Sequence, residues 1–338
     1  MTGVVRRLKP SASAETVRDM LNFRMRALLD KRPYWSGMIK HKVIAIPDAY
    51  TTGSVAMALD SPVVTGTATA WPVDDVVNST LVNAISNVGA QRVTPASMVG
   101  ITEDTILYVD SGGTPEVVAV EQVFPNSFIA TFAYVHNAAA TITSSSLCNR
   151  QLRLGYQNPI LSILAVVSAT SLIVDQPWGA AAISGSAYQI LKMFITIDPK
   201  IKMVMHCIPS VLIGWDIRTN VAQAELMALD PWRQSTGDPT WLGDNEQNLN
   251  RNFQYELYPP PTTQRQYTMS YATQWPDMQN PGDRPVPFLS GSVLIDGALS
   301  SLLRLKLDPD DVFVDRVSAD HFEKKWFEAT ESLVYADN

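Results

Sequence analysis

The sequence predicts an α+β protein, in which N- and C-terminal segments form a helical domain and antiparallel β-sandwich or barrel modules are inserted between them. Long stretches with apolar residues at helical spacing lie near the two ends, and the middle consists of short β-branched runs separated by Gly, Pro, Asn and Ser. The expected divisions are an N-terminal helical segment at 1–41, a β-sandwich region at 42–195 with an inserted β-module at about 99–145, a mixed β/α region at 196–306 that closes on the helical domain, and a C-terminal helix and tail at 307–338.

The composition indicates a protein with a substantial core and a polar, weakly charged surface. Of the 338 residues 46% are hydrophobic, while only 17% are charged, which is below the usual share of about 25%. This balance favours extensive interfaces. A net charge of −7 argues against tight wrapping of a nucleic-acid backbone. The most apolar run, 160–174, is too short and too rich in hydroxyls to span a bilayer, so we expect no membrane partner.

The first element is a helix over residues 13–31. Ser13 is placed to cap its first turn, and Glu15 suits the positive end of the helix dipole. The apolar residues that follow at threes and fours are Val17, Met20, Leu21, Met25, Leu28 and Leu29. The segment that ends in Trp35 contains a proline, which stops the helix.

The region from 42 to 195 is predicted to be β-rich, with one short helix within 73–95. It contains an internal similarity: residues 123–139 align with 167–183 at a constant offset of 44 residues without gaps. In each copy a strand, a tight polar turn and a second strand precede an Ala/Gly-rich loop. This similarity is explained either by chance between two strands of a sandwich or by duplication of a β-module.

The stretch VVTGTATAWP, residues 63–72, combines alternating threonines with small residues. An alternation of period two predicts a strand with Thr65, Thr67 and Thr69 on one face and small or apolar residues on the other. Trp71 and Pro72 then end the strand. The pattern predicts a scaffold strand and not a catalytic loop.

Mixed elements follow residue 196. We expect two strands within 202–217, a short helix at 221–231 capped by Asn220, edge strands within 254–276 and a helix at 292–305. A last helix is predicted at 319–334, with Ser318 as its cap. Its apolar face would consist of Phe322, Trp326, Ala329 and Leu333.

No catalytic, cofactor-binding or metal-binding residue is predicted, and the chain is not expected to be an enzyme. The nucleophile-elbow, P-loop and dinucleotide-binding patterns do not occur in the sequence. The four histidines are scattered, and Cys148 and Cys207 have no close partner in sequence. The acidic run at 308–315 lacks the central glycine and the final glutamate of a calcium loop.

Three sets of motifs follow one another along the chain in a recognisable order. DAYTTGSVAMALDSPVVTGTATAWP and VVSATSLIVDQPWGAAAISGSAYQI are similar to paired strand segments in structural virion proteins of tailed bacteriophages, and LYVDSGGTPEVVAVEQVFPNSFIATFAYVHNAAATI resembles a further phage β-module. MALDPWRQSTGDP, YELYPPPT and PVPFLSGSVLIDGALSSLLRL resemble the later part of head-to-tail adaptor proteins. Each motif is weak alone, but together they cover most of residues 12–335 in the expected order.

This resemblance implies a structural protein of the virion neck, assembled in the host cytoplasm. Such adaptors form a homo-oligomeric ring, typically of twelve copies, between the portal protein and the tail or a further neck protein, and genomic DNA passes through them transiently. The residues expected to make core or inter-subunit contacts are Met20, Met25, Leu28 and Trp35 near the N-terminus, and Phe322, Trp326 and Leu333 near the C-terminus.

Two alternatives remain open. One is another phage tail, baseplate or decoration protein built from the same β-modules, although the terminal helices favour the adaptor. The other is a carbohydrate-active enzyme on a β scaffold, suggested by Trp71, Trp178, Trp241 and Trp275. These tryptophans stand next to or near Pro or Gly at strand ends, where core and interface anchors are more common.

Overall fold

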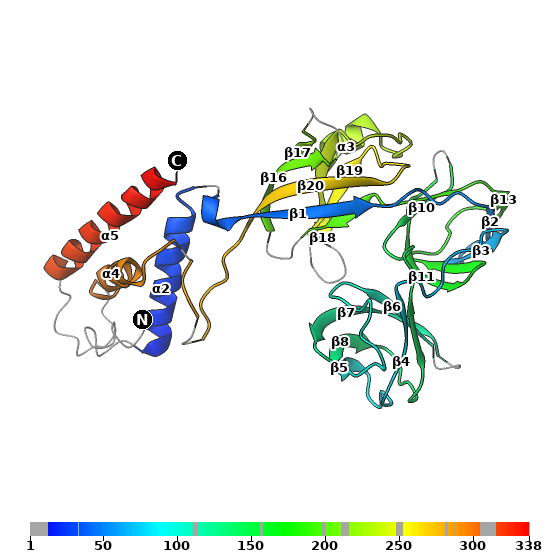
Figure 1. Ribbon diagram of the computed structural model, residues 1–338, viewed down its shortest axis with the longest axis horizontal. Coiled ribbons are helices and arrows are strands. Elements are labelled where there is room, and N and C mark those ends of the chain that lie inside the picture. Colours follow the sequence, from blue (N-terminus) through cyan, green and yellow to red (C-terminus); the bar gives the residue numbers. More distant parts are fainter. Residues whose placement is uncertain are drawn as a thin grey trace. The chain divides into compact units, whose positions relative to one another are not determined.

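The chain forms a helical unit and a β unit, seen in the computed structural model (Figure 1). The helical unit comprises 1–41, 200–203 and 270–338, and the β unit comprises 42–199 and 204–269. The predicted α+β class, with helices toward both termini and antiparallel sheets between them, is confirmed. The residues that the structure describes are 13–32, 34–110, 114–155, 158–197, 201–210, 216–247, 253–280, 283–286, 288–304 and 316–337.

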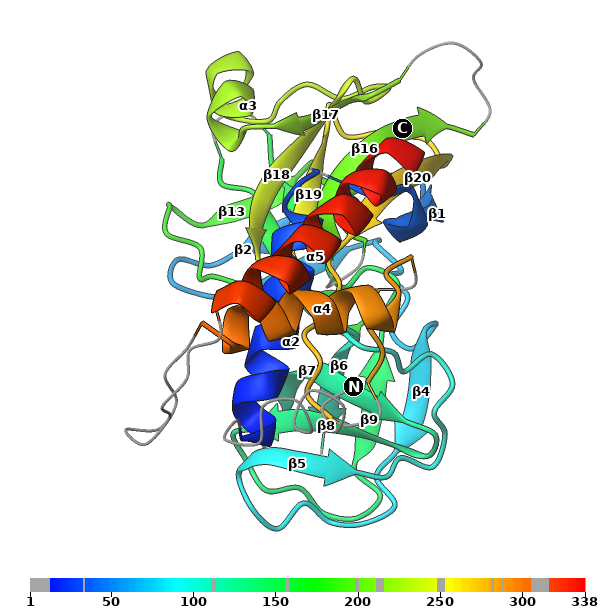
Figure 2. The same cartoon turned by 90° about the vertical axis from the view of Figure 1, so that its left-hand side faces the viewer.

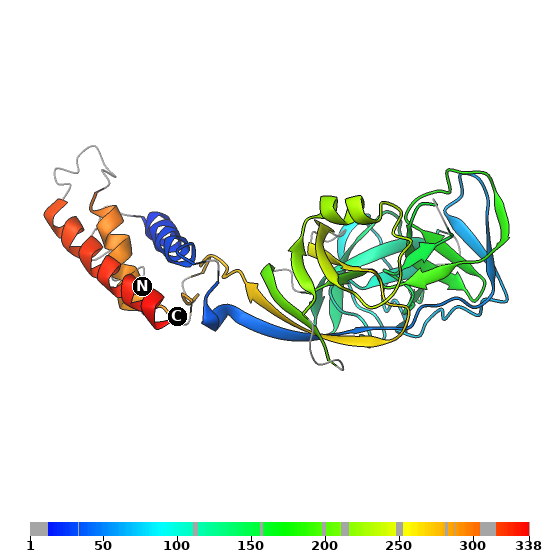
Figure 3. The same cartoon turned by 90° about the horizontal axis from the view of Figure 1, so that it is seen from above.

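The described part of the helical unit contains three α-helices: α2 (Ala14–Leu29), α4 (Gly291–Leu302) and α5 (Arg316–Ala336). Helix α4 packs against both α2 and α5 and lies between them in Figure 3. The core has formed because each helix turns its apolar stripe inward. Its fully or nearly fully buried members include Val17, Leu21, Met25, Leu28, Trp35, Leu294, Ala298, Leu302 and Trp326. A short 3₁₀ turn, η1 (Ser36–Met38), leads from α2 into the first strand.

The predicted start of the first helix is confirmed, and that of the last helix is wrong. Ser13 Oγ accepts a hydrogen bond from Thr16 N at 3.0 Å, as an N-cap should. Helix α5, in contrast, begins at Arg316, so Ser318 lies inside the helix and is not its cap. The neighbouring Ala319 is fully buried. Tertiary packing therefore holds the first turn of α5, which the local cap signal alone could not reveal.

Asn220 does not cap the short helix α3 (Gln223–Leu229), whose N-cap is Ala222. Asn220 instead belongs to strand β17 (Arg218–Val221) and has a positive φ of 56°. Its Nδ2 donates to the carbonyl of Val204 at 2.8 Å. The left-handed conformation that Asn tolerates is thus used to turn the strand before the helix begins.

The described strands form four sheets, in the orders β1-β20-β16, β13-β2-β3-β12-β11-β10-β14, β15-β19-β18-β17 and β4-β9-β6-β7-β8-β5. The first of these contributes residues to both units. Every recorded pairing is antiparallel except that of β17 with β18. The remaining strands are β1 (Ile39–Ile46), β2 (Ser54–Met57), β3 (Val63–Thr67), β4 (Val77–Thr80), β5 (Gly89–Val93), β6 (Ile106–Asp110), β7 (Glu116–Phe124), β8 (Ser127–Phe132), β9 (Thr141–Ser144), β10 (Gln151–Arg153), β11 (Leu161–Ser168), β12 (Ser171–Val174), β13 (Ile183–Ser186), β14 (Gln189–Leu191), β15 (Phe194–Thr196), β16 (Ile201–Pro209), β18 (Trp241–Gln247), β19 (Phe253–Tyr258) and β20 (Arg265–Thr273).

Both β19 and β20 lie inside their sheets, so the expectation of edge strands within 254–276 is wrong. Of the two strands expected within 202–217, the first is β16. The second falls mainly on residues outside the described part of the chain.

Strands β4 to β9, which follow one another in the chain, form the six-stranded sheet, and this sheet is a separate module. The helix expected within 73–95 is absent from these described residues, which form β4 and β5 instead. Alternating burial in β4, where Val77 and Ser79 point inward, shows the period of a strand. The module therefore begins before residue 99, because β4 and β5 pair with its other strands.

The internal similarity corresponds to two hairpins whose turns match. Phe124 pairs with Ser127 across the β7–β8 turn, and Ser168 pairs with Ser171 across the β11–β12 turn, 44 residues later. Beyond the turn the registers differ by one residue, because β11 has an irregularity between Val166 and Ser168 that β7 lacks at the corresponding place. The outer partners correspond, since β8 lies between β7 and β5 while β12 lies between β11 and β3. The matching turn and strand order agree with duplication of a β-module, whereas the shifted register does not.

The alternation of threonines ends before Thr69. Thr65 and Thr67 are exposed on β3, but Ala68 has a φ of 56°, and Thr69 is fully buried. Thr69 Oγ1 donates to the carbonyl of Ala169 at 2.7 Å. The prediction of one threonine face is therefore wrong for Thr69, because the left-handed residue reverses the side-chain direction. Strand β3 itself is confirmed.

The reversed side chain of Thr69 requires a glycine at position 66, and replacing Gly66 tests this requirement. A Cβ at Gly66 would lie 2.3 Å from Thr69 Oγ1 and 2.5 Å from its Cγ2. We expect Gly66→Ala to lower the free energy of unfolding of the β unit by about 1–3 kcal/mol, because buried Thr69 has little room to move. Urea unfolding followed by tryptophan fluorescence measures the change.

Gly179→Ala is the matched control, since a Cβ there meets no atom within 4 Å. It should leave the unfolding midpoint almost unchanged. Equal midpoints for the two variants would contradict the role assigned to Gly66.

Candidate functional site

The residues expected at the core or at interfaces all lie in the core of the helical unit or on its edge. Met25, Leu28, Trp35 and Trp326 are at most 4% exposed. Met20, Phe322 and Leu333 are partly buried and pack against the same core. These contacts are within one chain, and a role between subunits stays a prediction. The sequence thus located the core of this unit but not its accessible surface.

Arg24 joins all three helices of this unit. Its Nη1 and Nη2 bind the two carboxylate oxygens of Glu323 on α5 at 2.9 and 2.6 Å. On α4, its Nε donates to Ser301 Oγ and its Nη2 to Ser300 Oγ, both at 2.8 Å. Partial burial of Glu323 opposes its ionisation, but hydrogen bonds from Arg24 and Ser300 lower the pKa of this carboxyl below its usual value. The bidentate geometry makes this a strong, directional contact.

Two basic residues that follow α2 connect it to the C-terminal part of α5. Lys31 Nζ donates to Thr330 Oγ1 at 2.9 Å and lies 3.2 Å from Glu331 Oε1. Arg32 Nη1 donates to Asp337 Oδ2 at 2.6 Å. Figure 2 shows α5 crossing the unit beside α4. The polar contacts are spread along α5 and hold it in one orientation.

Among the described residues of this unit, four aromatic side chains are exposed: Phe23, Tyr34, Phe327 and Tyr335. Phe327 is 59% exposed, and the ammonium of Lys31 lies 5.2 Å from its ring centroid. Exposed aromatic groups of this kind are typical of protein interfaces. Phe327 lies outside the apolar repeat that predicted the buried face of α5, so the repeat did not single it out as a functional residue.

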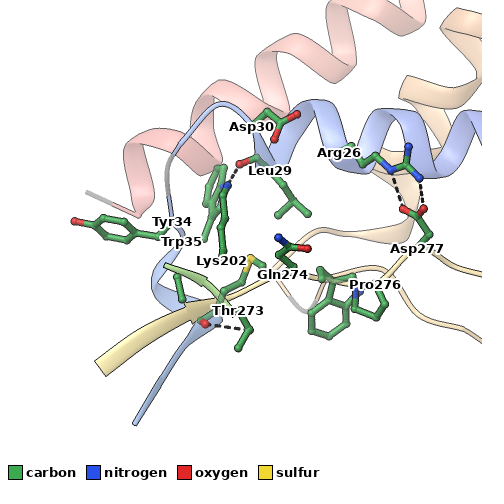
Figure 4. A pocket seen from close by; sticks show the side chains of 13 residues that line it. Arg26, Leu29, Asp30, Tyr34, Trp35, Lys202, Thr273, Gln274, Pro276 and Asp277 are labelled. Atoms are coloured by element: carbon green, nitrogen blue, oxygen red, sulfur yellow. Dashed lines mark hydrogen bonds and ion pairs between the residues drawn. The ribbon is translucent and has the colours of Figure 1, made fainter. Parts of the chain in front are cut away.

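A pocket of about 400 Å³ lies within the helical unit (Figure 4). Its apolar lining includes Leu29, Trp35, Met38 and Trp275. Trp35 Nε1 donates to the carbonyl of Leu29 at 3.4 Å, which fixes the indole in the wall. Arg26 Nε donates to Asp277 Oδ1 at 2.8 Å on the other side of the pocket. This bond holds the pKa of the Asp277 carboxyl below its usual range.

Polar side chains around this pocket remain available to a ligand or partner. Asp30, Tyr34, Lys202 and Gln274 make no side-chain hydrogen bond or ion pair within the described part of the chain. An apolar base with a few free polar groups is the general form of a binding site. No sequence motif pointed to this pocket, because its walls come from segments far apart in the chain.

The two adaptor-like motifs around 227–239 and 255–262 meet in the β unit. Arg233 and Glu256 form a buried ion pair, with side chains 5% and 1% exposed and with Nη2 3.2 Å from Oε2. Arg233 Nη1 also donates to the carbonyl of Leu226 at 3.0 Å, and Gln223 Nε2 donates to Glu256 Oε2 at 2.8 Å. The ion pair between the two motifs therefore fixes α3 on strand β19.

Neutralising Glu256 should destabilise the β unit strongly. Glu256→Gln leaves the buried Arg233 guanidinium without its counter-charge, at a cost of about 3–5 kcal/mol in the free energy of unfolding. The control is Glu225→Gln, which removes an exposed ion pair with Arg218 at 3.2 Å and should cost less than about 1 kcal/mol. Denaturant unfolding of both variants measures the difference; similar losses would argue against a buried, uniquely paired charge.

A second buried carboxylate organises the inserted module. Glu116 accepts hydrogen bonds from Ala133 N at 2.8 Å and Tyr134 N at 3.2 Å, and its Oε1 lies 2.5 Å from His136 Nε2. Glu116 begins the EVVAV motif and His136 belongs to the following Ala-rich loop. The two parts of the phage-like β-module are therefore in contact, and His136 has a structural partner.

The described residues contain no group of three or more His, Cys, Asp and Glu side chains that could hold a metal ion. The acidic run at 308–315 lies outside them. Trp71 and Trp178 are 2% and 1% exposed, so they cannot stack on a sugar in this conformation, while Trp241 and Trp275 are partly buried. Among the described helices, none combines the length and apolarity that crossing a membrane would need.

The comparisons with known proteins add no family assignment. No protein-family model matches the sequence, and no curated protein matches it. The functional conclusion therefore depends on the motifs, their arrangement in the fold and the surfaces described above.

Proposed function

We propose that this chain is a structural virion protein of a tailed bacteriophage, a ring-forming head-to-tail adaptor that joins the portal protein to the tail or to a further neck protein. The observation that carries the proposal is the helical unit, in which 13–41 and 270–337 fold together while the β-modules occupy the chain between them. This is the architecture implied by the resemblance to adaptors. Fold alone does not define function, so the proposal also depends on surface chemistry.

The contacts of the helical unit suit a mechanical role. Arg24, Lys31 and Arg32 connect α2 to α5 through ionic hydrogen bonds, so a load on one helix passes to the other. Phe23, Phe327 and Tyr335 remain exposed on this braced unit. Such side chains offer the aromatic contact area that subunit interfaces use. A ring closed by identical contacts would repeat this surface around its axis, in twelve copies if it follows the usual adaptor symmetry.

The charge of the chain is compatible with a DNA conduit. A net charge of −7 disfavours persistent binding of the phosphate backbone. DNA would then slide through the ring during packaging and ejection, and the closed ring would help to retain the packaged genome. The protein would act in the neck of the virion after assembly in the host cytoplasm, without catalytic chemistry.

Electron microscopy of particles made without this protein tests the proposed function. In a virus with this gene deleted, heads should fill with DNA but remain without tails, and they should then lose the packaged DNA. Supplying the protein in trans should restore tailed particles. In particles that contain the protein, labelled antibodies against it should bind at the neck. Tailed particles with an altered tip would favour a baseplate protein, and intact infectious particles would favour a decoration protein. Cleavage of a host polysaccharide by the purified protein would favour the enzyme.

Exposed aromatic residues of the helical unit should be needed for assembly but not for folding. Phe327→Ser removes a side chain that is 59% exposed, so thermal unfolding should stay close to that of the unchanged protein. Incorporation into virions should fall at least tenfold, as expected for loss of an aromatic interface anchor. Quantitative immunoblotting of purified particles measures incorporation.

Val99→Ser is the control, because Val99 is 77% exposed but belongs to the β unit. Incorporation of this variant should be unchanged. Normal incorporation of Phe327→Ser would remove α5 from the proposed interface. Truncation of α5 is a poorer test, because Trp326 belongs to the core of the helical unit.

A further inference from the structure

The pocket of about 400 Å³ beside Trp35 has room for a large apolar side chain (Figure 4). Trp35, Met38 and Trp275 contribute to its apolar wall, and all of its lining residues belong to the helical unit. In protein interfaces, apolar pockets of this kind receive an anchor residue of the partner, most often an aromatic one. The apolar wall therefore indicates an aromatic or aliphatic occupant.

The charged residues that line the pocket restrict this occupant further. Arg26 and Asp277 compensate each other, because Arg26 Nε donates to Asp277 Oδ1 at 2.8 Å (Figure 4). Asp30 and Lys202 are exposed and form no ion pair within the described part of the chain. The pocket thus presents one uncompensated charge of each sign. A complementary partner brings an apolar anchor flanked by a cation and an anion.

One face of α5 carries this combination. Phe327 is 59% exposed, with Lys324 three positions before it and Glu328 directly after it. Residues three and four apart share a face of a helix, so the three side chains are neighbours. Lys324 Nζ lies 3.9 Å from Glu328 Oε1, and the two side chains are 78% and 64% exposed. Exposed pairs of this kind contribute little stability, so both charges remain available to a partner.

We propose, on the basis of the ring-forming function above, that this pocket receives Phe327 of a second copy of the chain. Lys324 of the second copy meets Asp30, and Glu328 of the second copy meets Lys202. Phe327 does not line the pocket of its own chain, so the contact joins two different surfaces of the helical unit. Contacts between two different surfaces close into a ring when the rotation between neighbouring copies allows it.

Cross-linking of two single variants tests the contact in the full-length protein. One variant carries Phe327→Cys and a purification tag, and the other carries Gln274→Cys in the pocket. Because each variant has only one of the two new thiols, a disulfide between them joins two different copies. After mild oxidation of the mixture we expect a covalent dimer of one tagged and one untagged chain.

Val99→Cys is the control for the pocket variant, because Val99 is 77% exposed but belongs to the β unit. The mixed dimer should form at least tenfold less with Val99→Cys than with Gln274→Cys, as expected if the pocket holds the anchor residue. Equal yields, or no mixed dimer with Gln274→Cys, would overturn the proposal.

Reciprocal charge reversal tests the pairing of Lys324 with Asp30. Lys324→Asp and Asp30→Lys each bring like charges together, so each should weaken self-association at least tenfold. The chain with both substitutions should associate to within about threefold of the unchanged protein, because the charges are again complementary. Sedimentation velocity over a concentration series measures association, and thermal unfolding confirms that each variant is folded.

Lys325→Asp is the matched control for charge reversal. Lys325 is next to Lys324 in sequence, but its ammonium lies 5.9 Å from the ring centroid of Phe322, away from Phe327. Its reversal should leave association unchanged. An unchanged protein without self-association, or a double variant no stronger than the single ones, would contradict the assigned contact. The proposed adaptor function would survive either result, since it fails only if particles made without the protein still carry tails.

Discussion

Closure of α2 onto α5 is the constraint on which the rest of the structure depends. Arg24 and Glu323 are 299 residues apart in sequence, yet their side chains form a bidentate ion pair that α4 serines complete. The β unit, residues 42–199 and 204–269, lies in the chain between the two segments that meet in this core. Residues 200–203 belong to the helical unit. Bringing such distant segments together costs loop-closure entropy, which the buried apolar stripes and the ionic contacts offset.

The β unit contains two similar hairpins that pack into separate hydrophobic cores. The hairpins β7–β8 and β11–β12 share the pairing at their turns and the strand order, but one packs around Phe128 and Phe132 and the other around Trp71 and Trp178. The buried carboxylates lie elsewhere in the unit, with Glu116 in the inserted module and Glu256 on the four-stranded sheet beneath α3. The two similar hairpins therefore have different side-chain surroundings.

The functional surfaces differ from the core in how much the sequence reveals. An apolar face is visible as a repeat, and Met25, Leu28 and Trp326 were correctly placed on such faces. Exposed Phe327 and the pocket beside Trp35 follow no repeat. Each depends on residues from separate segments, so neither spacing nor composition could locate it.

The sequence by itself determined the fold class, the cap at Ser13, most of the helices and the hairpin turns. These features depend on neighbouring residues and on apolar periods of two or 3.6 residues. Only the tertiary structure decided the rest. Thr69 is buried because Ala68 reverses the strand, and Asn220 turns β17 because Val204 accepts its amide. Arg233 can be buried because Glu256 arrives from a distant strand. Burial of a polar group requires a partner, and the position of that partner is set by the whole fold.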